Sequence, residues 1–346
     1  MLGTLLAGGN LLAAQARLLG REATVRGAIL LAEVEPRRRA VVEDLGGSPP
    51  GPRVVVFCHY DPAGRLAEHA RRYLEALLAA GLSVVFVSNA GRLEAAAIDW
   101  LRPRCARVII RRNIGFDFGA WRDAIALAEL PAAGTRLLVL ANDSVYGPLR
   151  PLAPLLERMD FEAADVWAMT DSWQLRFHLQ SYLVAFGPAA LRHPVFGQFW
   201  AGVRDLRSKA AVVRRYEVGM TQTLLAAGLR CGALWPYVET LAAFHAGAEE
   251  AAAPLSDSPL LGAVRQAARQ RILGAATQRV PMNPTAELWR PLLQAGFPFL
   301  KRELLRRNPS RIPDLAAWIE LARAVSPGDT EVILRDLRSS LRQTAP

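Results

Sequence analysis

Four short groups of polar residues carry the side chains in this sequence that are best placed to bind or transform a ligand. Each group directly follows an apolar run, and they are His59, Tyr60 and Asp61; Ser88 and Asn89; Asn113, Gly115 and Asp117; and Asn142, Asp143 and Ser144. One polar turn means little, because turns are polar in general. Four groups in the same position relative to an apolar run favour one shared site, in which a carboxylate could hold a divalent cation against phosphate oxygens.

The elements that must position these groups alternate between strand and helix patterns. Apolar, β-branched runs predict buried strands at 53–61, 82–91, 106–113 and 136–143. The stretches between them predict helices at 65–81, 92–103 and 119–130. This alternation is typical of an α/β fold with a parallel sheet covered by helices on both faces. Because such sheets bind ligands at the carboxyl ends of their strands, the four polar groups would meet at one edge.

The segment 113–121, NIGFDFGAW, leads from the third predicted strand into a helix. Gly115 and Gly119 permit a positive φ or a close backbone approach, and the free N–H groups at a helix start could bind a diphosphate. The alternative is a tight strand–helix turn capped by Asp117. The segment matches neither a Walker phosphate loop nor a dinucleotide-binding fingerprint.

Asp143 follows the fourth predicted strand directly, between Asn142 and Ser144. A carboxylate there could hold a metal ion against phosphate oxygens. The alternative is an Asx turn that closes the strand, continued by Gly147 and Pro148. Spacing alone leaves both interpretations open.

The second half of the chain is less regular. It predicts a helix at 151–159, strands at 165–173 and 180–188, helices at 195–203 and 216–229, and a last strand at 231–238. Beyond about residue 250 the strand patterns stop and the chain becomes Arg-rich and helical. We therefore expect a helical leader and linker over 1–50, an α/β core over 51–250 and a basic helical extension over 251–346. The apolar start favours an amphipathic helix packed on the body, since it lacks the basic region of a secretory signal.

Composition places the chain among ordinary globular proteins, with 51% hydrophobic and 21% charged residues. Disorder, collagen and coiled coil are therefore excluded as its main architecture. The three cysteines are too few and too scattered for a disulfide framework or a structural zinc site, which favours reduced thiols in the cytoplasm. No run of about 18 uncharged apolar residues predicts a membrane-spanning helix.

The formal net charge of +10 comes almost entirely from arginine, because Lys209 and Lys301 are the only lysines among 42 basic residues. Such usage resembles a coding bias, and no aromatic interleaving or known motif points to nucleic acid as a partner. About +7 of the charge lies in residues 261–346, which contain 14 basic and 7 acidic residues. A solvated helical face or contact with an anionic membrane leaflet or lipid phosphate would explain this excess.

Several separated motifs resemble the rhamnan synthesis protein F family, whose members are associated with the assembly of bacterial surface polysaccharides. They span about residues 53–310 and are NIGFDFGAW, NDSVYGPL, HLQSYLVAF, YEVGMTQ and FPFLKRELLRRNP. The resemblance implies similarity to inverting glycosyltransferases of the GT-A fold over residues 51–250. Those enzymes use a nucleotide-sugar donor, usually with Mg²⁺ or Mn²⁺ held near an acidic Asp-x-Asp motif.

The resemblance also implies roles for individual residues. The donor's nucleotide and diphosphate would lie against His59, Tyr60, Asn89, Asn113, Gly115 and Asp117. The acceptor would lie against Trp167, Thr170, Gln180, Ser181 and Tyr182. Asn142, Asp143 and Ser144 stand where the acidic motif would be, and Asp143 is its only carboxylate. A metal would therefore have fewer protein ligands than in the family pattern, or would not be used.

Transfer with inversion needs a general base that takes the proton of the acceptor hydroxyl. In GT-A enzymes this base is an Asp or Glu from the second half of the core. Glu217 is the first candidate, because it opens the predicted helix 216–229, and Asp171 is the second. The alternative for Glu217 is that an acid in the first turn simply favours the helix dipole.

Together these inferences predict a cytoplasmic glycosyltransferase that moves a sugar, such as rhamnose or another deoxyhexose, to a growing surface polysaccharide or lipid-linked acceptor. Within the basic extension, Arg302 and Arg306 lie on one helical face and could contact the phosphate of such an acceptor at the inner leaflet, or solvent. The alternative function is a non-catalytic glycan-binding or assembly factor on a degenerate glycosyltransferase fold. The missing carboxylates at 142–144 favour that alternative.

Overall fold

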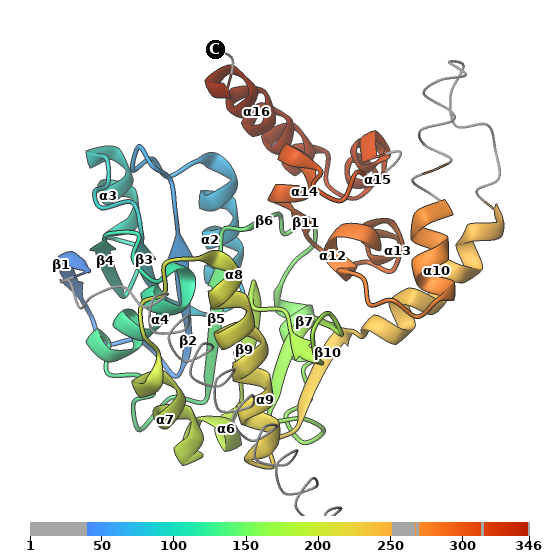
Figure 1. Ribbon diagram of the computed structural model, residues 1–346. Coiled ribbons are helices and arrows are strands. Elements are labelled where there is room, and N and C mark those ends of the chain that lie inside the picture. Colours follow the sequence, from blue (N-terminus) through green and yellow to red (C-terminus); the bar gives the residue numbers. More distant parts are fainter. Residues whose placement is uncertain (1–39, 251–266, 268–269, 313–314, 345–346) are drawn as a thin grey trace, which may run out of the picture.

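The computed structural model describes residues 40–250, 267, 270–312 and 315–344, so the helix expected at the start of the chain lies outside the described residues (Figure 1). A central sheet has the strand order β1-β4-β3-β2-β5-β9-β7-β10, and the short β8 (His178–Leu179) pairs with β7. The strands along this order are β1 (Val41–Gly47), β4 (Arg107–Arg111), β3 (Ser83–Ser88), β2 (Arg53–His59), β5 (Leu137–Asn142), β9 (Leu183–Phe186), β7 (Val166–Ser172) and β10 (Cys231–Trp235).

Strand direction brings most of the carboxyl ends to one edge of the sheet. β2, β3, β4 and β5 are parallel, as the sequence predicts. β9 runs antiparallel to both β5 and β7, so β7 and its parallel partner β10 point the same way as β5. The predicted α/β class, with a mostly parallel sheet between helices, is therefore confirmed.

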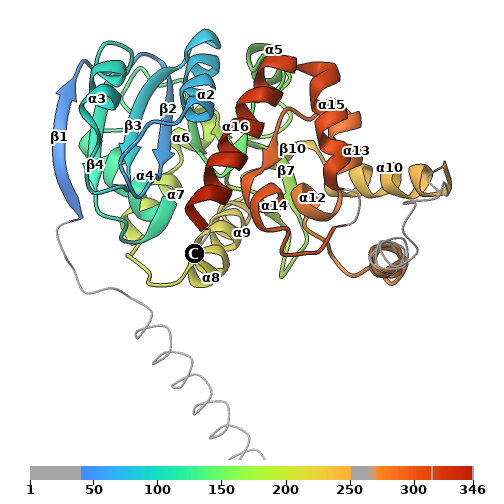
Figure 2. The ribbon, with the colours of Figure 1, turned by 90° about the horizontal axis from the view of Figure 1, so that it is seen from above.

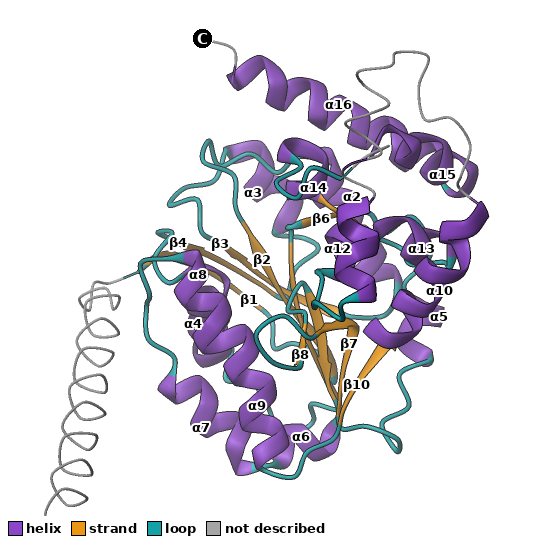
Figure 3. Cartoon of the chain, turned by 45° about the vertical axis from the view of Figure 1, so that its right-hand side comes forward, coloured by secondary structure: helices purple, strands orange, loops and turns teal. Residues whose placement is uncertain are grey.

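Helices cover both faces of the sheet, which explains why its central strands are apolar throughout. Val54, Val56 and Cys58 of β2 pack into one layer, and Val55 and Phe57 pack into the other. The first layer contains α4 (Phe116–Leu127), α6 (Pro188–Arg192), α7 (Pro194–Gly202), α8 (Lys209–Val212) and α9 (Val218–Ala226). The second contains α2 (Glu68–Ala79), α3 (Ala95–Leu101) and α5 (Ala153–Glu157), as Figure 3 shows.

Residues 41–47 form an antiparallel edge strand, where we expected part of a linker, so that expectation is wrong. β1 pairs with β4, with Val41 opposite Arg111 and Gly47 opposite Arg107. Its sequence, VVEDLGG, has two acids and two glycines and therefore carries a weak strand pattern. An ion pair between Asp44 and Arg107 helps to hold it against its neighbour.

The C-terminal region packs around its own apolar cluster beside the sheet (Figure 1). It contains α10 (Tyr237–Glu250), α12 (Pro284–Glu287), α13 (Trp289–Gln294), α14 (Arg302–Arg307), α15 (Trp318–Val325) and α16 (Pro327–Thr344). Figure 2 shows α16 beside α2, where Arg72 and Asp329 form an ion pair of 2.8 Å. None of the helices in the described ranges combines the length and apolar character needed to cross a membrane.

A two-stranded ribbon joins this region to the end of β5. β11 (Leu300–Lys301) pairs antiparallel with β6 (Val145–Tyr146), so the expectation of no strand beyond residue 250 is wrong at this point. The backbone N–H of Arg302 also donates to the Ser144 carbonyl at 3.0 Å. The ribbon therefore brings the C-terminal region directly to the predicted site.

Candidate functional site

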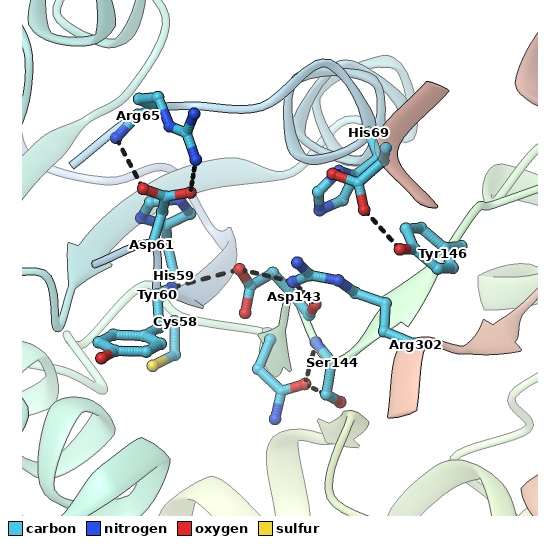
Figure 4. Close-up of polar contacts among 12 residues, drawn as sticks. Cys58, His59, Tyr60, Asp61, Arg65, His69, Asp143, Ser144, Tyr146 and Arg302 are labelled. Carbon is cyan, nitrogen blue, oxygen red and sulfur yellow. Dashed lines mark hydrogen bonds and ion pairs between the residues drawn. The ribbon is translucent and has the colours of Figure 1, made fainter. Parts of the chain in front are cut away.

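Asp143 holds the ends of β2 and β5 together. Its backbone N–H donates to the Cys58 carbonyl at 3.1 Å, and its Oδ2 accepts from the backbone N–H of Tyr60 at 3.2 Å. Nη1 of Arg302 lies 3.1 Å from the same Oδ2 and donates to the Asp143 carbonyl at 2.6 Å. Figure 4 shows Asp143 between Tyr60 and Arg302. The single carboxylate of the 142–144 group is thus already paired with a cation from the C-terminal region.

Asn142 forms the Asx turn that the sequence left open as an alternative. Its Oδ1 accepts from the backbone N–H of Ser144 at 3.1 Å and from the Ser144 hydroxyl at 2.5 Å. Its Nδ2 donates to Oδ2 of Asp117 at 2.9 Å. Asn142 therefore links the end of β5 to the start of α4.

Asp117, in the first turn of α4, is the second carboxylate at this edge. Its Oδ1 accepts a weak hydrogen bond of 3.6 Å from the Cys58 thiol, in addition to the bond from Asn142. Burial, reinforced by the negative charge of Asp143, raises the pKa of Asp117 to about 6. Carboxyl groups that titrate this close to neutral pH are concentrated at functional sites.

Close packing against charged residues fixes the conformation of the loop before α4. Gly115 has φ +75°, and a Cβ at this position would lie 2.3 Å from Oδ1 of Asp205. Arg111, at the end of β4, is completely buried and pairs with Asp123 at 2.9 Å. Asn113 is exposed on this loop. Glycine at 115 is therefore required both by the backbone conformation and by the close approach of Asp205.

The residues after β2 and β3 differ in what they can reach. His59 and Asn89 are only 1% and 2% exposed, and burial lowers the pKa of His59. Asn89 donates to a backbone carbonyl at the start of α4 and accepts from Arg111 at 2.6 Å. Tyr60 is 44% exposed. His59 and Asn89 are thus buried and support these loops, and Tyr60 is the one of these three residues whose side chain is exposed.

Three of the five residues implied for the acceptor side form one buried hydrogen-bonded group. Oγ1 of Thr170 lies 2.8 Å from Oε1 of Gln180 and 2.7 Å from the Tyr182 hydroxyl. Trp167 does not join them, because it lies at the amino end of β7, where its Nε1 donates to the Asp160 carbonyl at 3.0 Å. Since β7 runs parallel to β5, Trp167 is at the edge opposite the site, and the expectation that it lines the acceptor is corrected.

Asp171, the second candidate base, lies at the carboxyl end of β7 but is 6% exposed. Its Oδ1 accepts a hydrogen bond of 2.5 Å from the backbone N–H of Tyr237, the first residue of α10. Burial raises the pKa of Asp171. These contacts give Asp171 a clear structural task at the start of α10.

Glu217 is more accessible, and its position in the helix differs from the prediction. It does not open a helix but ends a π-helical turn, Val213–Glu217, within a helical segment that runs from Lys209 to Ala226. The helix-dipole explanation for an acid at this position therefore does not apply. Its Oε1 accepts from the backbone N–H of Ser181 at 2.9 Å. Turns of this kind interrupt helices frequently at functional sites.

Both lysines of the chain come to this region, which sequence reasoning did not predict for Lys209. Lys209, at the start of α8, has its Nζ 3.6 Å from the Glu303 carboxylate. Its positive charge lowers the pKa of Asp117 and so opposes the effects of burial and of Asp143. Burial lowers the pKa of Lys301, and the negative charge of Glu217 opposes that shift. The available signal was their rarity, since every other basic residue except histidine is arginine.

Arg306 is engaged within the fold. It pairs with Asp336 at 2.8 Å and donates from Nε to the Tyr146 hydroxyl at 3.1 Å. Arg302 and Arg306 thus both make ion pairs inside the protein, where the sequence suggested a lipid-linked phosphate or solvent as their partner.

The side chains around Asp143 do not fit a divalent metal ion. Mg²⁺ and Mn²⁺ prefer several oxygen ligands. Asp143 is paired with Arg302, and Asp117 accepts hydrogen bonds from Asn142 and Cys58. Within the described ranges, no three or more His, Cys, Asp or Glu side chains group in a way that could hold an ion.

Known proteins resemble the chain in sequence and in structure. Over 221 residues it is 29% identical to virulence protein VirA of Vibrio anguillarum, which is 62% of this chain and 67% of VirA. A putative nucleotide-diphospho-sugar transferase from Desulfovibrio desulfuricans G20 has 15% identity and a TM-score of 0.32, covering 66% of this chain and 98% of that one. The glycosyltransferase GlyE of Streptococcus pneumoniae TIGR4 has 13% identity and a TM-score of 0.38, covering 84% of this chain and 64% of that one. These TM-scores assign no activity.

The family match is more direct and covers most of the site. It begins at residue 84 and ends at residue 250, so it includes the polar groups after β3, β4 and β5 as well as Glu217. The FPFLKRELLRRNP motif and the residues of β2 lie outside it. Residues 84–250 match the Rhamnan synthesis protein F family, which confirms the resemblance seen in the motifs.

Proposed function

We propose that this protein is a GT-A-like glycosyltransferase that moves a sugar from a nucleotide-sugar donor to a glycan acceptor in surface polysaccharide synthesis. The observation that carries the proposal is the position of Asp117, Asp143 and Glu217 at the carboxyl edge of the sheet. Asp143 directly follows β5, Asp117 accepts a hydrogen bond from the last residue of β5, and Glu217 accepts one from the loop before β9. All three lie in the segment that matches the rhamnan synthesis family. Rhamnose or another deoxyhexose is the proposed sugar, and a growing polysaccharide or lipid-linked glycan on the cytoplasmic side is the proposed acceptor.

Glu217 is the proposed general base. It would take the proton of the acceptor hydroxyl while that oxygen attacks the anomeric carbon, and the bond from this carbon to the diphosphate would break with inversion. The hydrogen bond from Ser181 to Oε1 orients the carboxylate without neutralising it. Asp171 fits this role less well, because it is buried and its carboxylate holds the start of α10.

The donor is proposed to lie across the ends of β2, β4 and β5. Tyr60 offers an exposed aromatic ring to the nucleobase. The loop with Asn113 and Gly115 and the side chain of Asp117 would lie beside the diphosphate. The negative charge of that group would raise the pKa of Asp117 further, so the protonated carboxyl could donate a hydrogen bond to a phosphate oxygen.

A thermal-shift panel of nucleoside diphosphates and nucleotide sugars tests the donor site. A ligand that binds only the folded protein stabilises it by about 2.7 kcal/mol at 100 times its Kd, and so raises the melting temperature. One preferred nucleoside diphosphate, with loss of its shift in Asp117→Ala, is the expected result. Release of that nucleoside diphosphate from the matching sugar donor, measured with a glycan acceptor, then tests transfer. No shift with any nucleotide at millimolar concentration would contradict the proposal.

The non-catalytic glycan-binding function is the second candidate, and the pairing of Asp143 with Arg302 is the observation that favours it. A site that lost its metal carboxylates during evolution would look like this. Restoration of polysaccharide synthesis in a deletion strain discriminates between the two. Synthesis supported equally by the Glu217→Gln, Asp117→Ala and unaltered proteins would show that no chemistry depends on these carboxylates.

A further inference from the structure

Arg302 places a guanidinium where an acidic motif would be expected to hold a metal ion. The pairing of β11 with β6 fixes the backbone before it, with Lys301 opposite Val145. The guanidinium carbon lies 5.6 Å from the centre of the Tyr146 ring, and its Nη1 contacts Asp143. Its Nε is buried and has no hydrogen-bond partner among the described residues. Arg302 is therefore held rigidly while part of its donor capacity stays unused.

Lys301 adds a second cation with unused donors. Its ammonium group makes no ion pair or hydrogen bond with any residue that the structure describes, although most of the side chain is removed from water. The nearby charges are those of Glu217, Glu303 and Glu287, which favour the charged ammonium, and that of Lys209, which opposes it. Burial of most of the side chain disfavours the charged form of Lys301, and a bound anion would supply hydrogen-bond acceptors for its ammonium group.

Lys209 lies in the same region but belongs to a different part of the chain. It lies at the start of α8, 69% exposed, and its ion pair with Glu303 spans 3.6 Å. An exposed pair of this length contributes little stability, so the ammonium group can move to a ligand at small cost. Its charge acts on both Asp117 and Lys301. Three cations from two distant parts of the chain thus lie near the carboxyl edge of the sheet.

We propose that Lys301, Arg302 and Lys209 bind the diphosphate of the sugar donor and do the work that a divalent cation does in related enzymes. This inference rests on the proposed transferase function and makes the C-terminal region part of the active site. It follows from the misfit between the side chains around Asp143 and a metal ion, from the unpartnered Nε of Arg302, and from the burial of most of the Lys301 side chain without a close ion-pair partner among the described residues.

The bonds formed and broken in the proposed transfer balance without a metal ion. The acceptor oxygen forms a bond to the anomeric carbon and loses its proton to Glu217. The bond between that carbon and the diphosphate oxygen breaks, and its electron pair stays on the leaving nucleoside diphosphate. The three cations stabilise the negative charge that develops on this oxygen, and preorganised cations are effective in that role. Arginine and lysine are both established phosphate ligands.

Binding of inorganic pyrophosphate and nucleoside diphosphates in EDTA, followed by isothermal titration calorimetry, tests the assignment. Lys301→Gln is expected to weaken binding about tenfold or more, as loss of one charge-assisted contact would. Arg307→Gln is the matched control, because it removes one positive charge from the exposed part of α14 and should change affinity less than about twofold. Arg302→Lys keeps the charge opposite Asp143 and should still weaken binding, since the fork of donors is lost. Melting temperatures show whether each variant is folded.

The outcomes distinguish the cationic diphosphate site from the transferase function. Binding only after Mg²⁺ or Mn²⁺ is added would overturn the cationic site but leave the transferase standing. Equal weakening by Lys301→Gln and Arg307→Gln would reduce the effect to general basic charge and overturn it as well. A preference for farnesyl diphosphate over every nucleoside diphosphate would move the site to a lipid-linked acceptor and overturn the donor assignment. No binding with or without metal would remove the donor site and the proposed function together.

Discussion

Asp117→Asn should stabilise the folded protein above pH 6, although it alters a residue of the candidate site. The wild-type carboxyl has its pKa raised from 3.8 to about 6 by burial and by the charge of Asp143. The folded state therefore binds this proton more tightly than the unfolded state does. Between about pH 4 and pH 6 stability falls as pH rises, by about 1.4 kcal/mol per pH unit. Above pH 6 the full penalty is present, and below pH 4 it is absent.

The magnitude follows from the size of the shift. About two pKa units correspond to about 3 kcal/mol, which is an upper limit because Asp117 is partly exposed to solvent. Asparagine removes the charge and keeps the shape, and its Oδ1 can still accept from Asn142. For a chain of this size the gain corresponds to a rise in melting temperature of at most roughly 5 °C.

Melting temperatures measured from pH 4 to pH 8 test this linkage. Asp99→Asn, which removes the same charge from an exposed position on α3, controls for the change in net charge. The difference between Asp117→Asn and wild type should grow between pH 4 and pH 6 and then stay constant. A variant that is less stable than wild type at pH 8, or a gain that does not change with pH, would refute the raised pKa as the cause.

Three further variants separate chemistry from stability. Glu217→Gln keeps the oxygen that accepts the backbone hydrogen bond, so it should bind the nucleoside diphosphate normally and lower kcat by about 100-fold or more; unchanged kcat would remove Glu217 as the base. Gly115→Ala combines φ +75° with a contact to Asp205 and should lower stability by about 1–3 kcal/mol in denaturant titrations, whereas Gly134→Ala has open space and should be neutral. Leu300→Ala should lower the free energy of unfolding by about 2–5 kcal/mol and also weaken pyrophosphate binding. Normal pyrophosphate binding by this variant would show that the β6–β11 ribbon does not support the site.

The parallel sheet could be predicted because its signals are local. Four apolar runs, each followed by polar residues and separated by helical stretches, define both the strands and the edge where their ends meet. β1 has no such signal, since its pairing depends on the exposed edge of β4 and on an ion pair across 63 residues of sequence. The position of Trp167 follows from strand direction, because it is the second residue of β7 and the site lies at the other end.

Long-range contacts within the site escaped prediction for a different reason. Asp143 and Arg302 are separated by 159 residues, and the pairing of β11 with β6 brings them together. A two-residue strand has no periodicity to recognise. The π-helical turn that ends at Glu217 likewise depends on packing rather than on a sequence motif. Sequence patterns thus located the residues on the sheet edge but not the contacts that bring Arg302 and Lys301 to it.

The origin of the cations bears on how the site could work. The family match ends at residue 250, whereas Lys301 and Arg302 come from the region beyond it. Asp143 alone would repel a diphosphate, because like charges at this distance disfavour each other. Arg302 cancels that repulsion, and Lys301 then adds a net attraction next to the proposed base. In the proposed site, packing of the C-terminal helices and binding of the donor would therefore be coupled, and a change that loosens the ribbon is expected to weaken the diphosphate contact before it disturbs the sheet.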